Sequence, residues 1–78
     1  MPTLPRDLRD LHYEGRSLTR GQHRVLRHIA LGLTGTETAR ALGISPETVK
    51  RQLAITRSKL KAKTTAHAVA IAVSLDLI

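Results

Sequence analysis

The residues of this chain whose types and spacing can do chemistry lie around one stretch, Gly43 to Arg51. Gly43 predicts the end of a helix, because glycine enters the left-handed cap conformation without a Cβ clash. Two residues later, Ser45 offers an oxygen to free backbone N–H groups and Pro46 suits the first position of a new helix. Two helices joined this closely must cross steeply, which is the geometry of a helix-turn-helix.

The second of these helices, expected over about 46–61, is predicted to present a basic face. When residues are projected at 100° each, one side carries Val49, Leu53, Thr56 and Leu60, and the other carries Glu47, Lys50, Arg51, Ala54, Arg57, Ser58 and Lys61. Lys50 and Arg51 come first after the turn, and their cationic donors suit phosphate oxygens and the O6 and N7 atoms of guanine. We therefore expect one side of the helix to be core and the other to be presented to a partner.

Composition limits what that partner is. The chain has 78 residues, a formal net charge of +7 from 13 Lys and Arg against 6 Asp and Glu, and a sequence pI of about 11.2. A polyanion is the expected partner of so basic a domain. Tyr13 is the only aromatic residue, so the stacking platforms of single-strand binders are missing and duplex DNA fits better.

Other functional classes find little support. The sequence has no cysteine, and its four histidines do not have helical metal-ligand spacing with a carboxylate partner. No Ser/His/Asp set, carboxylate pair or phosphate loop has a catalytic spacing. We expect no metal, no cofactor, no small-molecule substrate and no enzymatic activity. The chain also lacks an export signal and a long apolar run, so we expect a cytoplasmic protein without a membrane span.

Capping residues predict where the helices around this stretch begin and end. Thr19 and Gln22, and again Thr34 and Glu37, have the capping-box spacing that opens a helix. The first of these helices should close at Gly32 and the second at Gly43. Eight apolar residues are assigned to the core: Leu18, Val25, Ile29, Leu33, Leu42, Val49, Leu53 and Leu60.

A last helix is expected from Thr64 to near Leu75. Its β-branched run also fits a strand, but a lone strand would have no ladder to join. One face carries Ala66, Val69, Ala70, Val73 and Leu77, and the opposite face carries Ala68, Ile71, Ala72 and Leu75. Because a small body covers only one of two apolar faces, we expect the first to be core and the second to be buried against another molecule.

Residues 1–17 are expected to form an N-terminal arm. Leu4, Leu8 and Leu11 recur at helical spacing, so a short helix over about 5–13 can pack a leucine stripe on the body. A frayed terminus and a basic arm that reaches a DNA groove are the alternatives. Seventeen residues are too few for a second folded domain, so a domain that stands alone is expected if the sequence is a whole protein, and an excised fragment is the alternative.

Seven landmarks in register give the segment 18–78 a family resemblance. They are Leu18-Thr19, Gly32-Leu33, Glu37-Thr38-Ala39, Leu42-Gly43-Ile44-Ser45, Thr48-Val49-Lys50, Lys59-Leu60 and Ala68-Val69-Ala70-Ile71-Ala72. The segment resembles the LuxR-type DNA-binding domain of bacterial regulators, also called GerE or NarL/FixJ C-terminal. The resemblance implies an all-α domain of four helices, with the third helix in the major groove of DNA and the fourth as a two-fold dimer contact through Ala68, Ile71, Ala72 and Leu75.

The resemblance also implies which residues read the bases. The family's base-contacting positions fall on Lys50, Arg51 and Ala54. Ala54 offers only an apolar contact to a thymine methyl, so the guanine contacts fall to the two cations. Ser45, Thr48, Arg57 and Lys59 are expected to contact phosphates, and Lys61 either does so or serves as a solubilising charge.

Thr56 departs from the family, which usually has a core isoleucine there. We expect its hydroxyl to bond the carbonyl one turn back, unless the helix is rotated slightly from the family register. Gly21 and Arg24 also depart from the family, which usually has Arg and Glu at these positions.

Two rival functions share parts of the pattern. A sigma-factor region 4 module has nearly the same helix-turn-helix core and acts within RNA polymerase, but it would end soon after Leu60. A protein-interaction module that forms mixed dimers would have little use for a basic recognition helix. The apolar segment from Thr65 to Leu75 and the basic face together favour a homodimeric transcription regulator, with RNA polymerase or another regulator as further candidate partners.

Overall fold

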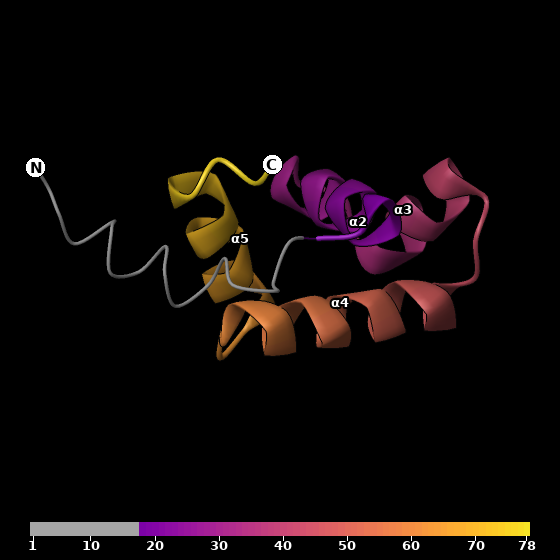
Figure 1. Cartoon of the computed structure of the whole chain (residues 1–78). Helices are drawn as coiled ribbons and strands as arrows, with labels where there is room; N and C mark the ends of the chain where they lie inside the picture. The colour runs from indigo at the N-terminus through magenta and orange to yellow at the C-terminus, as the bar shows by residue number, and fades with distance from the viewer. Residues whose placement is uncertain (1–17) are drawn as a thin grey trace, which may run out of the picture.

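Four helices account for the part of the chain that the structure, a computed structural model, describes, which is residues 18–78 (Figure 1). They are α2 (Arg20–Ala30), α3 (Gly35–Leu42), α4 (Pro46–Leu60) and α5 (Thr65–Ser74). Residues 18–78 contain no strand, which confirms the all-α prediction for them. None of these helices is long and apolar enough to cross a bilayer. The expected arm over residues 1–17 lies outside the described residues.

Both predicted capping boxes are present. At the start of α2, the Thr19 hydroxyl accepts from the Gln22 N–H at 3.2 Å while the Gln22 side chain accepts from the Thr19 N–H at 3.0 Å. At the start of α3, Thr34 and Glu37 make the same exchange at 3.1 and 2.9 Å. Each box satisfies backbone donors that a helix start leaves free. Each of the two helix starts is therefore specified by four consecutive residues of sequence.

The turn between α3 and α4 also forms as predicted. Gly43 ends α3 in the left-handed conformation with φ of 69°, and the Ile44 N–H donates to the Ala39 carbonyl at 3.0 Å. Ser45 caps α4 by accepting from the Thr48 N–H at 3.1 Å, with Pro46 in the first turn. The end of one helix and the start of the next are therefore locked by local bonds, which sets the crossing of the two helices.

The core consists of two hydrophobic clusters joined along α4. One contains Val25, Ala39 and Val49, with Leu42, Ile44 and Leu53 partly buried around it. The other contains Leu26, Leu60, three residues of α5 and Leu75 just after it, with Leu53 again at its edge. In Figure 1, α4 runs along the lower side of the domain beneath α2 and α3, with α5 at its left end. Since both clusters pack on one side of α4, the opposite side is left to solvent.

The assignment of individual core residues is confirmed only in part. Val25, Val49 and Leu60 are buried, while the other five predicted core residues, Leu18, Ile29, Leu33, Leu42 and Leu53, are only partly buried. Leu26, which the core assignment leaves out, is fully buried. A domain this small has too little interior to enclose every apolar residue at helical spacing.

The last helix forms, but the prediction of which face it presents is wrong. The face expected to meet another molecule is the interior one: Ala68, Ile71, Ala72 and Leu75 are all buried in this chain alone. The exposed residues of α5 that belong to the predicted core face are Ala66, Ala70 and Val73, while Val69 is partly buried. Both faces of α5 are mainly apolar, with His67 and Ser74 as its exposed polar residues. The larger Ile71 and Leu75 decide which face is buried by packing on Leu26 and Leu60.

Candidate nucleic-acid interface

One side of α4 faces solvent along its length. We call this side the presented face, and it consists of the exposed residues Glu47, Lys50, Arg51, Ala54, Ile55 and Ser58. The structure brings the three predicted base-contacting residues together on it, because Ala54 lies one helical turn beyond Lys50 and Arg51. Two cationic donors and one small apolar side chain therefore lie side by side on a convex surface.

The opposite side of α4 is held in the core by packing, and its buried hydroxyl group is hydrogen-bonded within the helix. Val49 and Leu60 are almost completely buried. Thr56 is also fully buried, and its hydroxyl donates to the Gln52 carbonyl at 2.7 Å. The bond to the carbonyl one turn back is thus confirmed for Thr56, with its neighbour Ile55 turned outward at 40% exposure. Packing of these residues fixes the rotation of α4 about its axis and hence which side chains are presented.

The amino end of α4 gathers polar groups suited to an anion. The Ser45 and Thr48 hydroxyl oxygens lie 2.9 Å apart in a hydrogen bond, with Ser45 exposed and Thr48 half-buried. The first N–H groups of any helix lack helical partners, and the helix dipole adds partial positive charge there. At this end Pro46 has no N–H and the Thr48 N–H is bonded to Ser45 Oγ, so the groups left to meet a phosphate are the Glu47 N–H and the exposed Ser45 hydroxyl.

Two of the predicted phosphate-contacting cations are used inside the domain. Arg57 donates from Nη1 to the Thr65 hydroxyl at 3.1 Å, which ties α4 to α5. Lys59 donates from Nζ to Gln22 Oε1 at 2.7 Å, which ties α4 to α2. Both cations are half-buried, whereas Lys61 is exposed just after the end of α4 in the left-handed conformation with φ of 55°. Sequence position alone did not reveal these links between helices.

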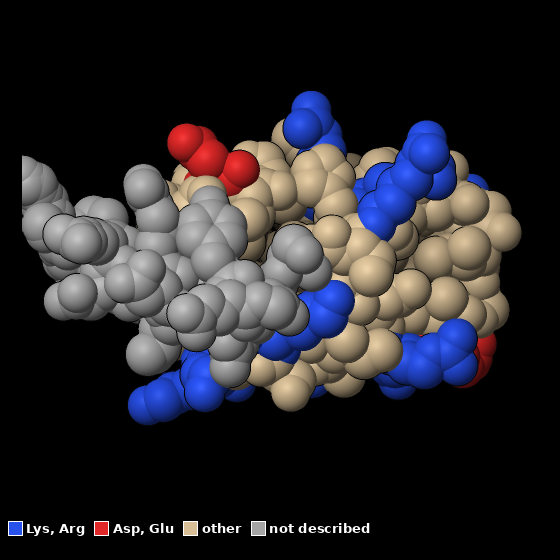
Figure 2. Space-filling view, viewed as in Figure 1, with Lys and Arg blue, Asp and Glu red and all other residues tan. Residues whose placement is uncertain are grey.

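Lys and Arg side chains are spread over the molecule, and part of them lie along α4 (Figure 2). Seen as in Figure 1, Lys and Arg side chains lie at both ends of the lower edge of the molecule, where α4 runs, with an acidic group at its right end (Figure 2). The cations of α4 are Lys50, Arg51, Arg57 and Lys59, and its only acid is Glu47. Among residues 18–78, no three potential metal ligands cluster together. The chemistry available at this surface is therefore attraction and hydrogen bonding to anions and base edges.

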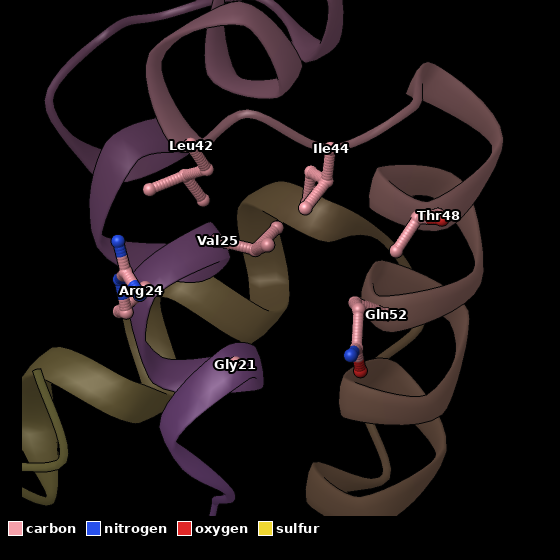
Figure 3. Close-up of a pocket in the computed structure, with 7 residues that line it drawn as sticks. All are labelled: Gly21, Arg24, Val25, Leu42, Ile44, Thr48 and Gln52. Carbon is pink, nitrogen blue, oxygen red and sulfur yellow. The ribbon is translucent and has the colours of Figure 1, made fainter.

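A small cleft behind α4 escaped the sequence reasoning. Its volume is about 120 Å³, and it is lined by Gly21, Arg24, Val25, Leu42, Ile44, Thr48 and Gln52. In Figure 3, Leu42, Ile44 and Val25 turn toward the hollow between the helices, with Thr48 and Gln52 on the wall that α4 provides. A Cβ at Gly21 would lie 3.2 Å from Gln52 Nε2. The missing side chain at Gly21 is the sequence feature that could have pointed to this cleft, because it lets α2 and α4 approach closely.

Comparison with known proteins agrees with this arrangement. Residues 16–72 match the model of the family described as bacterial regulatory proteins, luxR family (GerE), which includes all of α2, α3 and α4 and most of α5. No curated protein and no solved structure was found to match the chain. The matched segment is more than half of the chain, and it contains the helix-turn-helix and the basic presented face. The chain belongs to the luxR family of bacterial regulatory proteins, whose helix-turn-helix domain binds DNA, and the match to this family covers residues 16–72.

Proposed function

We propose that the domain is a sequence-specific transcription regulator that binds duplex DNA as a homodimer, with α4 lying in the major groove. The observation that carries this proposal is the presented face of α4, where Lys50, Arg51 and Ala54 stand exposed on a helix whose other side is packed in the core. An α-helix with its side chains is about 10–12 Å across and fits a major groove about 12 Å wide.

Lys50 and Arg51 are the proposed readers of base sequence. Both are exposed in the first turns after the helix-turn-helix turn, where side chains reach base edges most easily. Arg and Lys donate to guanine O6 and N7, so each half-site should contain a guanine opposite this pair. Ala54 has no donor or acceptor on its side chain and contributes shape, including contact with a thymine methyl.

The proposed phosphate contacts are strongest at the two ends of α4. Ser45 offers an exposed hydroxyl, bonded to that of Thr48, at the amino end of α4, and Lys61 is an exposed cation at the other end. Arg57 and Lys59 are already bonded to other helices, so we propose that they contribute chiefly through their positive charge. Contacts at both ends of a recognition helix would set its register on the duplex.

Because the face first expected to form the dimer contact is buried, the proposed dimer contact is the exposed side of α5. Ala66, Ala70 and Val73 repeat at intervals of four and three residues and are exposed, with Val73 57% accessible. Val73 also borders an apolar groove of about 200 Å³ together with Leu31 and Ile78. Small side chains at this spacing allow two helices to approach closely about a two-fold axis. Two copies would double the positive surface that meets DNA.

The function is tested by selecting bound sequences from random duplex DNA at physiological salt. An inverted repeat with half-sites about one helical turn apart is the expected result for a symmetric dimer. Lys50→Ala and Arg51→Ala proteins should select sequences with relaxed preference at the guanine. If no sequence is enriched, the proposal of sequence-specific binding is wrong.

The dimer is tested separately by measuring molar mass in solution, with and without the enriched duplex. The unaltered protein should reach the mass of a dimer at micromolar concentration, and Val73→Asp should remain a monomer because it places a charge on the two-fold contact. Circular dichroism should show both to be equally helical. A chain that stays monomeric at high micromolar concentration, even on its duplex, would contradict this part of the proposal.

A further inference from the structure

Ile55 is an apolar side chain on a surface that is otherwise polar, basic or small. Among the residues that the structure describes, the exposed large hydrophobic ones are Leu31, Ile55 and Val73, and only Ile55 belongs to α4. Ile55 is 40% exposed, and that part of its apolar area stays in water and adds no stability to the domain. Isoleucine is also a weaker helix former than alanine or lysine because its branched Cβ is restricted in a helix. Neither packing nor helix propensity accounts for the exposed part of this side chain.

The orientation of Ile55 is imposed by its neighbour. Thr56 is fully buried and bonded to the Gln52 carbonyl. A rotation of α4 that buried Ile55 would move Thr56, Val49 and Leu60 out of their packing. Ile55 is therefore held outward by the same contacts that present Lys50 and Arg51.

The position of Ile55 around the helix lies between two kinds of expected contact. At 100° per residue, Ile55 projects about 40° from Arg51, the proposed base contact. It projects about 20° from Thr48, the proposed contact to the DNA backbone. Within the major groove, the C5-methyl group of thymine is the part of the base nearest the backbone of its own strand. A side chain on the flank of the helix meets that methyl before it meets the hydrogen-bonding atoms deeper in the groove.

We infer that Ile55 contacts a thymine C5-methyl group and adds a thymine to the sequence that Lys50 and Arg51 read. This inference rests on the proposed function. Ile55 has no hydrogen-bonding group, and the methyl is the apolar feature that distinguishes thymine from the other bases in the major groove. Two cations hold the helix against an anionic duplex, while one branched aliphatic chain discriminates among pyrimidines. Ala54 next to it is too short to cover the same area.

The experiment uses the enriched duplex with each thymine replaced in turn by deoxyuridine, which removes only the methyl group. Equilibrium binding is measured for the unaltered protein and for Ile55→Ala. The control is Thr36→Ala, which shortens an exposed side chain of α3 outside both the presented face and the proposed dimer contact. We expect the unaltered protein to lose about fourfold in affinity at one thymine of each half-site, which corresponds to ~0.8 kcal/mol for one buried methyl group.

Ile55→Ala should bind the thymine and deoxyuridine duplexes equally well, while Thr36→Ala should keep the fourfold difference. The inference is overturned if no single replacement weakens the unaltered protein, or if Ile55→Ala stays sensitive to the same methyl. In both of those cases the enriched duplex is still bound, and the proposed function stands. Failure to enrich any duplex would instead remove the proposed function and this inference together.

Discussion

The helices α4 and α5 both leave one side exposed to solvent, and the two sides differ in chemistry. The exposed side of α4 carries Lys50 and Arg51, whereas that of α5 carries Ala66, Ala70 and Val73. A charged side suits an anionic duplex, and a side made of small apolar residues suits another protein surface. Both helices bury their other side in the same domain, so a chain of 78 residues presents two exposed sides of different chemistry on adjacent helices.

The same contrast explains why one helix was oriented correctly and the other was not. On α4, polar and apolar residues are segregated, and only one rotation buries Val49 and Leu60 without burying charge. On α5 both faces are mainly apolar, so either face could be turned into the core without burying a charged side chain. The size of Ile71 and Leu75 and their fit against the rest of the core decide between the two rotations of α5. A local sequence pattern carries no information about that fit. Segregation of charge is thus a stronger guide than hydrophobicity alone.

The largest expected effect tests the orientation of α5. Leu75→Ala should lower the free energy of unfolding by about 2–5 kcal/mol, because it removes a buried side chain and leaves a cavity. Val73→Ala should change it by less than about 0.5 kcal/mol when measured on dilute, monomeric protein. Urea unfolding followed by circular dichroism measures both. Equal losses for the two variants would mean that α5 does not bury the face containing Leu75.

The next effect tests the exposed side of α4. Lys50→Ala and Arg51→Ala should each weaken binding to the enriched duplex by about 1–3 kcal/mol, because each removes donors to a base edge. Their unfolding free energies should stay within about 0.5 kcal/mol of the unaltered protein, since both side chains are exposed. Fluorescence anisotropy with labelled duplexes measures the binding. Unchanged affinity and unchanged base preference would mean that neither residue recognises a base.

A smaller effect concerns two buried threonines. Thr38 Oγ1 on α3 is buried without a hydrogen-bond partner, whereas the Thr56 hydroxyl on α4 is bonded. Thr38→Val should therefore raise the free energy of unfolding by about 1 kcal/mol, because it removes a desolvated polar group. Thr56→Val, the matched control, should show little or no gain because it gives up a hydrogen bond. A larger gain at Thr56 than at Thr38 in thermal and urea unfolding would contradict this account.

The smallest expected effect lies at the junction of α4 and α5. Lys61 has a φ of 55°, so Lys61→Gly should stabilise the fold by about 0.5 kcal/mol by relieving a left-handed residue. The substitution also removes a proposed phosphate contact, which should flatten the dependence of log K on log salt by about one unit. Lys61→Asn tolerates the same backbone and isolates the loss of charge. If Lys61→Asn keeps the full salt dependence, Lys61 does not contact DNA.

Much of the candidate site could be read from the sequence because its geometry is local. The turn follows from Gly43 and Ser45, each of which acts on backbone groups within four residues of itself. The exposure of Lys50 and Arg51 follows from where α4 begins and from its apolar side. By contrast, the cleft beside Gly21 depends on how closely two helices approach.

The sequence by itself determined the four helices, the turn between α3 and α4 and the outward side of α4, because caps and charge segregation act over a few residues. Only the tertiary structure decided which face of α5 is buried and that Arg57 and Lys59 bond to neighbouring helices. Their partners, Thr65 and Gln22, lie 8 and 37 residues away along the chain. Contacts at that separation arise from packing of whole helices, whose fit depends on side-chain shape rather than on local spacing.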